Sequence, residues 1–189
     1  MESALIVSGT EKSAAVFAEI LRQASINDIV TLKTCGEARR LLLEQDFDLV
    51  VVNAPLRDES GESFSRDTAS KMLSQVILVV NSEHFDEVSA VVENDGVLTI
   101  SKPVNRPMFW STLTLARSAW RNIRRVQNEN AKLKQKIEDI RIVDRAKCIL
   151  ISHMNMSEQE AHRYIEKQAM DLRSTRRKVS EGILKTYEN

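Results

Sequence analysis

Short apolar runs alternate with amphipathic stretches over the first 116 residues of the chain. The apolar runs are rich in Val and Ile, and they lie at residues 4–7, 29–32, 49–52, 76–80 and 97–100. Strands that are apolar on both faces are typical of a parallel sheet with helices on each side. The stretches between them have the length of crossover helices, at residues 12–24, 36–45, 64–73 and 84–93. The pattern predicts an α/β fold, a flavodoxin-like, doubly wound sheet of five parallel strands.

A different periodicity follows Pro107, after which the chain has no further proline and one glycine. Apolar or small residues then recur at alternating spacings of three and four, which is typical of a coiled-coil seam. The seam begins at Ala116 and Ala119 and continues through Ile123, Val126, Asn130, Leu133, Ile137 and Ile140. A single Asn at a seam position fixes the register of a two-stranded coiled coil. We therefore predict a homodimer through residues 123–140; the alternative is a long helix that packs against its own N-terminal domain.

The end of the chain predicts a small all-α unit of three helices. Residues 144–154 continue the long helix, and Ser157-Glu158-Gln159-Glu160 is a capping box that opens a second helix. Ser174 or Thr175 is placed to cap a third helix. The predicted inner faces carry Ile165, Ala169 and Leu172 on the second helix and Val179, Ile183 and Leu184 on the third. We expect an N-terminal domain at 1–107, a linker helix and coiled coil at 108–143, and a helical domain at 144–189.

Charge divides unequally between the two halves of the chain, although the formal net charge is zero. Residues 1–116 hold 10 Lys and Arg and 17 Asp and Glu, or 10 − 17 = −7. Residues 117–189 hold 17 and 10, or 17 − 10 = +7. A basic half indicates an anionic partner for that half alone.

Other sequence features narrow the class of protein. The apolar runs fall far short of the roughly 20 residues that span a bilayer. The acidic start, Met1-Glu2-Ser3, differs from a secretory signal. Cys35 and Cys148 lie far apart, with no metal-ligand spacing around them. We expect a cytoplasmic protein that has no membrane contact and holds no metal or cofactor.

The N-terminal landmarks resemble those of a response-regulator receiver domain. Phe47 and Asp48 precede the third apolar run, and Ser101-Lys102-Pro103 follows the fifth, as in that family. In the family, two acids follow the first strand and an Asp ends the third. Those carboxylates hold Mg²⁺, and one of them accepts the phosphoryl group.

This chain departs from the receiver pattern at the positions that carry the chemistry. The phosphoacceptor position is Asn53, and the acid pair is replaced by Ser8 and Gly9. Where the family has a hydroxyl residue after the fourth strand, this chain has Asn81, with Ser82 as the alternative one position later. Lys102 and Pro103 are retained. An amide has no anionic oxygen to attack phosphorus, so we predict a pseudo-receiver that is not an enzyme and is not phosphorylated by the aspartyl route. Its input is expected from a regulatory protein or a small ligand.

The C-terminal helices resemble an ANTAR domain, an RNA-binding module of response regulators. The matching residues include Ala146-Lys147, Ser157, Glu160-Ala161 and Ala169-Met170. Cys148 and Gln168 depart from the pattern, because the family usually has Gly and a basic residue there. The resemblance implies that a dimer binds paired hairpin loops in nascent mRNA leaders and prevents transcription termination.

Basic residues on the predicted C-terminal helices are the candidate RNA contacts, and they are Lys147, Arg173, Arg176, Arg177 and Lys178. The last three are consecutive, so they cannot share one helix face. Tyr164 is placed either to stack on a base or to pack in the core. Two other functions stay open: a DNA-binding response regulator with a helix-turn-helix output, and a non-catalytic protein-interaction scaffold.

Overall fold

The structure is a computed structural model that describes residues 1–71 and 74–187. The chain divides into two units, Met1–Arg125 and Val126–Asn189. Residues 72–73, at the end of the predicted third crossover helix, and residues 188–189 lie outside the described residues. A long helix, α5 (Arg106–Met154), contributes residues to both units.

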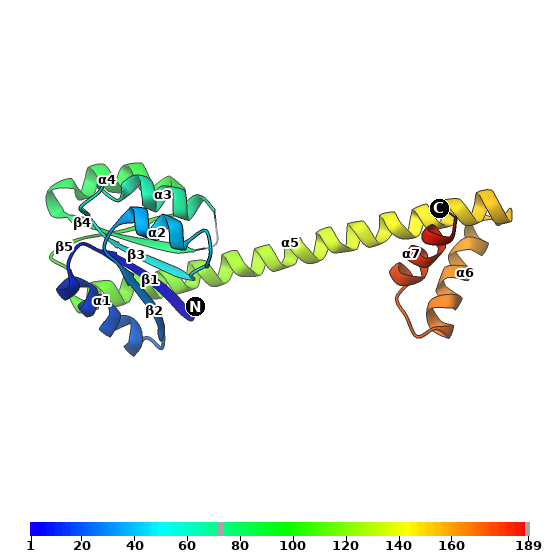
Figure 1. Ribbon diagram of the computed structural model, residues 1–189, viewed down its shortest axis with the longest axis horizontal. Coiled ribbons are helices and arrows are strands. Elements are labelled where there is room, and N and C mark those ends of the chain that lie inside the picture. Colours follow the sequence, from blue (N-terminus) through cyan, green and yellow to red (C-terminus); the bar gives the residue numbers. More distant parts are fainter. Residues whose placement is uncertain (72–73, 188–189) are drawn as a thin grey trace. The chain divides into compact units, whose positions relative to one another are not determined.

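The N-terminal unit is built on five parallel strands in the order β2-β1-β3-β4-β5 (Figure 1). The strands are β1 (Ser3–Ser8), β2 (Asp28–Leu32), β3 (Leu49–Asn53), β4 (Gln75–Asn81) and β5 (Leu98–Lys102). This order confirms the flavodoxin-like prediction. The register pairs Ser8 with Asn53 and Asn81 with Lys102, so these four residues lie at the carboxyl edge of the sheet.

Helices cover both faces of this sheet (Figure 1). The face that packs on α1 (Glu11–Gln23) and α5 carries Leu49 and Val51, and the opposite face carries Val50 and Val52. The second face packs on α2 (Cys35–Leu41), α3 (Glu62–Ser70) and α4 (Phe85–Val92), with short 3₁₀ turns η1 (Ser82–His84) and η2 (Glu93–Asp95). Burial on both faces explains why the strands are apolar at consecutive positions.

Helix α2 is shorter than the predicted helix at 36–45. It ends at Leu41, and the amides of Leu43 and Glu44 then donate to carbonyls three residues back, which winds the chain into a turn. Leu43 is 80% exposed, whereas Phe47 is buried. The chain turns here because Phe47 must reach the core before β3 begins.

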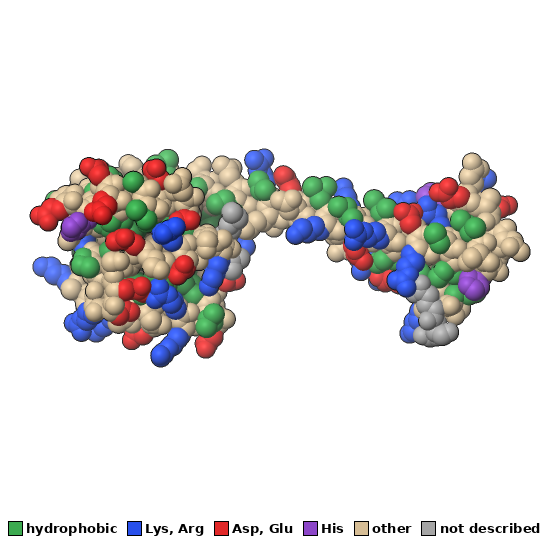
Figure 2. Space-filling model, turned by 90° about the horizontal axis from the view of Figure 1, so that it is seen from above, with side chains coloured by type: hydrophobic (Ala, Val, Ile, Leu, Met, Phe, Trp, Pro, Cys, Tyr) green, Lys and Arg blue, Asp and Glu red, His purple; other side chains and the backbone are tan. Residues whose placement is uncertain are grey.

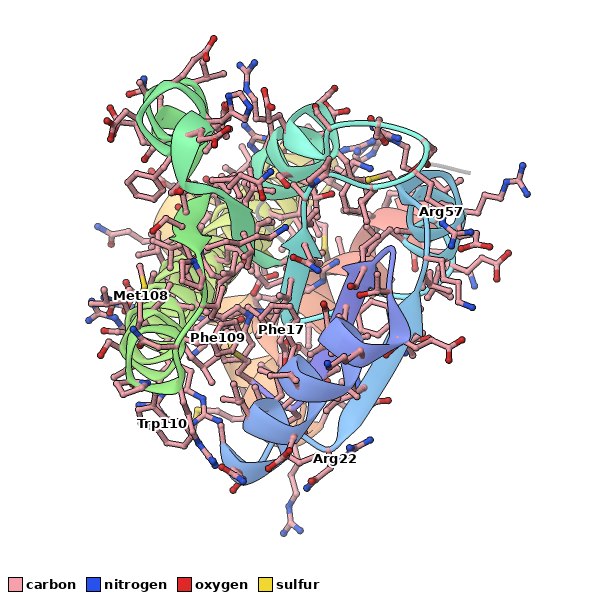
Figure 3. All side chains as sticks on the ribbon, turned by 90° about the vertical axis from the view of Figure 1, so that its left-hand side faces the viewer. Phe17, Arg22, Arg57, Met108, Phe109 and Trp110 are labelled. Carbon is pink, nitrogen blue, oxygen red and sulfur yellow. The ribbon has the colours of Figure 1, made fainter. Side chains whose placement is uncertain are left out.

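The first turns of α5 pack on the sheet. Phe109, Leu113 and Ala116 are buried at helical spacing, and the Phe109 ring centroid lies 5.2 Å from that of Phe17 on α1 (Figure 3). The Arg117 guanidinium donates to the Ala24 carbonyl at the end of α1. Ala116, which the heptad pattern placed at the start of the dimer seam, therefore belongs to the core of the N-terminal unit.

The C-terminal unit combines the end of α5 with α6 (Glu158–Asp171) and α7 (Arg176–Tyr187). The predicted capping box is present at Ser157 and Glu160. Thr175, rather than Ser174, caps α7, because its hydroxyl accepts from the Lys178 amide at 3.3 Å. The core consists of Ala146, Leu150, Ala161 and Ile165, with Val143, Met156, Tyr164, Val179, Ile183 and Leu184 packed around them.

The two cysteines differ in their surroundings. Cys35, in the first turn of α2, is buried, and burial raises the pKa of its thiol. Cys148, on α5 in the C-terminal unit, is exposed. Over residues 1–71 and 74–187, no helix combines the length and apolar character needed to cross a membrane.

Candidate nucleic-acid interface

The turn between α6 and α7 places Arg173 in an unusual backbone conformation. The Arg173 and Ser174 amides donate to the carbonyls of Met170 and Ala169, which is the Schellman pattern of a helix end. Arg173 occupies the left-handed position of that motif at φ +46°, where glycine is usual. The prediction that Leu172 faces inward is wrong: Leu172 is 65% exposed because α6 has already ended at Asp171.

Lys147 lies between two carboxylates of its own unit. Its ammonium nitrogen is 2.8 Å from Asp144 Oδ1 and 3.5 Å from Glu158 Oε1. The hydrogen bond to Asp144 is the main reason that the pKa of Lys147 is raised. The Lys147 side chain is only 16% exposed, so an RNA phosphate that binds here would compete with these carboxylates for its ammonium group.

Arg176 and Arg177 also have carboxylate partners on other helices. Arg176 Nη1 lies 3.2 Å from Glu166 Oε1 on α6. Arg177 Nη1 lies 2.8 Å from Asp139 Oδ1 on α5, and its Nε lies 2.7 Å from Glu181 Oε1 on α7. The pKa of Arg177 is raised by these two carboxylates, chiefly by Asp139. The guanidinium of Arg177 thus links α7 to α5 through an ion pair, and the side chain stays partly exposed.

One pocket brings three of the five predicted RNA contacts together. It has a volume of about 480 Å³, and its basic lining consists of Lys147, Arg176 and Arg177. Ile140 and Val143 supply apolar surface, and His162 and Thr175 add polar groups. Asp139 and Asp144 also line it, so the lining contains both cations and carboxylates. Figure 2 shows the same close mixing of Lys and Arg with Asp and Glu side chains on the C-terminal unit.

The other two predicted contacts, Arg173 and Lys178, do not line this pocket. Both are exposed, and neither side chain has an ion-pair partner within the described ranges, 1–71 and 74–187. They are placed to meet an anion without first losing an internal partner.

Two further cations, Arg163 and Lys167 on α6, were not among the predicted RNA contacts. They are exposed and four residues apart, so they share a helix face, and Met170, 79% exposed, follows on the same face. The signal that could have found them is this spacing on the side of α6 opposite to Ile165 and Ala169.

The predicted seam residues on α5 remain exposed apolar side chains in a single chain. Ile123 is 38% exposed, Val126 49%, Leu133 55%, Ile137 52% and Ile140 59%. Asn130, in the middle of the seam, is also exposed. Within the N-terminal unit, by contrast, the α5 residues Phe109, Leu113 and Ala116 are buried.

The carboxyl edge of the receiver-like sheet carries the neutral side chains of Ser8 and Asn53 and the cation Lys102. Asn53 Nδ2 donates to Ser8 Oγ at 3.1 Å, and Ser8 Oγ donates to the Thr10 carbonyl at 3.2 Å. A side chain added at Gly9 would meet open space. The Lys102 ammonium donates to the Ala54 carbonyl, and Pro103 follows at the start of the β5–α5 loop. No cluster of metal-ligating side chains occurs in the part of the chain that the structure describes.

The C-terminal residues match a known domain family. Residues 131–184 match the model of the ANTAR domain. Over 169 residues, the chain is 27% identical to the transcriptional regulatory protein PdtaR of Mycobacterium tuberculosis. This similarity covers 89% of the present chain and 82% of that protein.

Solved structures resemble the N-terminal unit. The signal receiver domain of an HD domain-containing protein from Pseudomonas fluorescens Pf-5 has a TM-score of 0.57 at 19% identity, covering 65% of this chain and 91% of that one. A response regulator receiver domain protein from Methanospirillum hungatei JF-1 has a TM-score of 0.57 at 20% identity, covering 65% and 98%. At these identities the likeness shows the receiver fold alone. The chain thus combines a receiver-like fold, a long helix and a C-terminal segment that matches the ANTAR domain.

Proposed function

We propose that this chain is an RNA-binding antitermination regulator that holds two ANTAR domains together as a homodimer. The ANTAR match and the similarity to a transcriptional regulatory protein support a two-component type regulator of transcription. The observation that carries the RNA proposal is the convergence of Lys147, Arg176 and Arg177 on one pocket of the ANTAR domain. Its partner would be the paired hairpin loops of an mRNA leader.

The chemistry of the pocket fits a hairpin loop. Loop bases are unstacked and offer flat faces and polar edges, while the backbone brings phosphates close together. The arginines of the pocket match phosphate through their planar forks, and Ile140 and Val143 offer apolar surface to a base. Because each pocket cation already has a carboxylate, phosphate binding is an exchange of partners, and the unpaired Arg173 and Lys178 supply the uncompensated attraction.

Dimerisation would make this modest attraction sufficient. The exposed apolar seam from Ile123 to Ile140 supports a second copy of α5 as its occupant, because its spacing is that of a two-stranded coiled coil. Two linked RNA domains gain affinity through effective concentration, by about 10² to 10⁴-fold where the geometry allows. Transcript loops that come in pairs would be selected over single loops.

The signal would reach the protein without an aspartyl phosphate. Asn53 ends β3 and is engaged with Ser8, and neither side chain has a carboxylate that could hold Mg²⁺ or accept a phosphoryl group. Input through a protein or a small ligand is therefore proposed. Incubation with acetyl phosphate and Mg²⁺ should leave the protein unlabelled.

The central experiment compares binding of the full chain to RNAs with two hairpin loops, with one loop, and to duplex DNA of the same sequence. We expect preference for the paired loops, a salt slope of about 0.7 per phosphate contact, and a dimer by sedimentation in the complex. Binding to none of these RNAs at low salt would contradict the proposal. Preference for duplex DNA would favour a helix-turn-helix output, although Val179, Ile183 and Leu184 pack inward and Ser180 is buried on α7.

A further inference from the structure

A second pocket lies in the N-terminal unit, between α1 and the segment that joins β5 to α5. Its volume is about 380 Å³, within the range of about 300 to 1,000 Å³ that is typical of small-ligand sites. Val16, Phe17 and Ile20 of α1 form an apolar wall. Figure 3 shows Phe17 directed toward Phe109 of α5, so this wall is held by the packing of α1 on α5.

The polar end of the pocket contains Lys102, a cation without an opposite charge. Its ammonium group donates to the neutral Ala54 carbonyl, and within residues 1–71 and 74–187 no carboxylate lies within ion-pair distance of it. Lys102 is partly buried, and burial lowers its pKa. A cation removed from water without a counter-charge is unfavourable, so this site is electrostatically incomplete.

The other polar groups of the lining leave that deficit in place. Asn53 and Asn105 are neutral, and Arg106 adds a second cation at the exposed rim. Among the described residues, Glu19 is the one carboxylate in the lining, but it is exposed to solvent and its Oε1 accepts a hydrogen bond from Gln23 at 3.4 Å. The buried end is therefore positive and the wall opposite it is apolar.

We propose that this pocket binds a small organic carboxylate that carries an aromatic or branched apolar group. The carboxylate would pair with Lys102 and accept from the Asn53 or Asn105 amide, and the apolar group would pack on Val16, Phe17 and Ile20. Inorganic phosphate would satisfy the charge but would leave the half-exposed Val16 of the apolar wall in water. The proposal concerns the N-terminal unit and stands or falls independently of RNA binding.

The test is a ¹⁹F NMR titration of the full chain with 4-fluorobenzoate as the probe. We expect saturable broadening of the probe signal, with a dissociation constant of about 1 mM or lower. The neutral isostere 4-fluorobenzamide should bind at least about tenfold more weakly. Inorganic phosphate should fail to displace the benzoate at equal concentration.

Variants locate the binding. Lys102→Gln should weaken benzoate binding about tenfold or more, whereas Lys12→Gln, an exposed lysine on α1 that does not line the pocket, should leave it unchanged. Val16→Glu places a carboxylate at the half-exposed pocket wall and should also weaken binding by repulsion. Because Val16 is a surface residue, this variant decides the question if Lys102→Gln does not fold.

The proposal is overturned by the absence of saturable broadening up to about 10 mM benzoate, by equal binding of the benzamide, or by displacement by phosphate. It is also overturned if folded Lys102→Gln or Val16→Glu binds benzoate as well as the unmodified chain does.

Discussion

The two units of this protein differ in how they pair their charged side chains and bury their apolar ones. The N-terminal unit buries apolar side chains on both faces of a sheet, yet among the described residues Lys102 has no carboxylate within ion-pair distance. The C-terminal unit pairs Lys147, Arg176 and Arg177 with carboxylates, yet it leaves Leu133 and Ile137 exposed on α5. Burial lowers the pKa of Lys102, whereas the hydrogen bond to Asp144 raises the pKa of Lys147, so the two shifts follow the same contrast. We propose that an organic anion binds the first unit and that a second copy of α5 covers the exposed apolar side chains of the second.

The largest expected effect comes from replacing the exposed apolar side chains of α5. The double substitution Leu133→Ser and Ile137→Ser should convert the dimer to a monomer by analytical ultracentrifugation and lower affinity for paired-loop RNA by about 10² to 10⁴-fold. The matched control, Lys132→Ser with Glu138→Ser, lies off the seam and leaves the net charge unchanged. If the seam variant still dimerises, the prediction is contradicted, because the exposed residues of α5 would then not form the dimer interface.

The next effect concerns the arginines of the C-terminal unit. Replacing Arg173, Arg176 and Arg177 together with Ala should lower RNA affinity by about tenfold to a hundredfold and make the salt slope shallower by about 2. The control removes three exposed cations from the N-terminal unit, at Lys12, Arg57 and Lys71. Affinity is measured by filter binding over a salt series. Equal losses of affinity in the two triple variants would mean that RNA binding depends on the overall charge of the protein and not on contacts with the ANTAR domain.

A smaller effect separates stability from binding at Arg173. Arg173→Gly should stabilise the C-terminal unit by about 1 kcal/mol, because glycine adopts the left-handed conformation without strain. The same variant should bind RNA a few times more weakly, because an unpaired cation is lost. Arg173→Ala removes the charge and keeps the strain, so it should weaken binding without gaining stability in urea unfolding. A stability gain in the alanine variant would contradict this explanation.

The smallest expected effect is a pH dependence at the α6 capping box. The Ser157 amide and hydroxyl lower the pKa of the Glu160 carboxyl from its ordinary value. A carboxyl with a lowered folded-state pKa adds stability that is present above its unfolded pKa and is lost as the pH falls through the folded value. Glu160→Gln cannot titrate, so its thermal midpoint should fall less between about pH 5 and about pH 3. Glu129→Gln, an exposed glutamate on α5, should behave like the unmodified chain.

Local patterns predicted most of the fold. Runs such as residues 49–52 gave the strands because burial on both faces demands consecutive apolar residues, and the Ser157 capping box located the start of α6. The end of α2 and the burial of Ala116 were not predictable, because both depend on how distant segments pack. A heptad pattern cannot tell a seam residue from one that packs on a sheet.

The candidate site was predictable as a set of cations and not as an electrostatic environment. Arg177 and Asp139 are 38 residues apart, and Lys102 and Ala54 are 48 apart, so no local spacing relates them. Whether a cation is paired or unpaired is decided by the fold. The same holds for Tyr164, which packs around the C-terminal core and is one of its partly buried members.

The contrast between the two cysteines provides a ready chemical handle. Alkylating reagents attack the thiolate, so the buried Cys35, with its raised pKa, should stay inert at neutral pH while the exposed Cys148 reacts. A maleimide fluorophore would then sit at a single site on α5 beside Lys147 in the native sequence. The anisotropy of the fluorophore would measure RNA binding, and energy transfer between differently labelled copies would measure subunit exchange. Neither measurement requires an engineered residue.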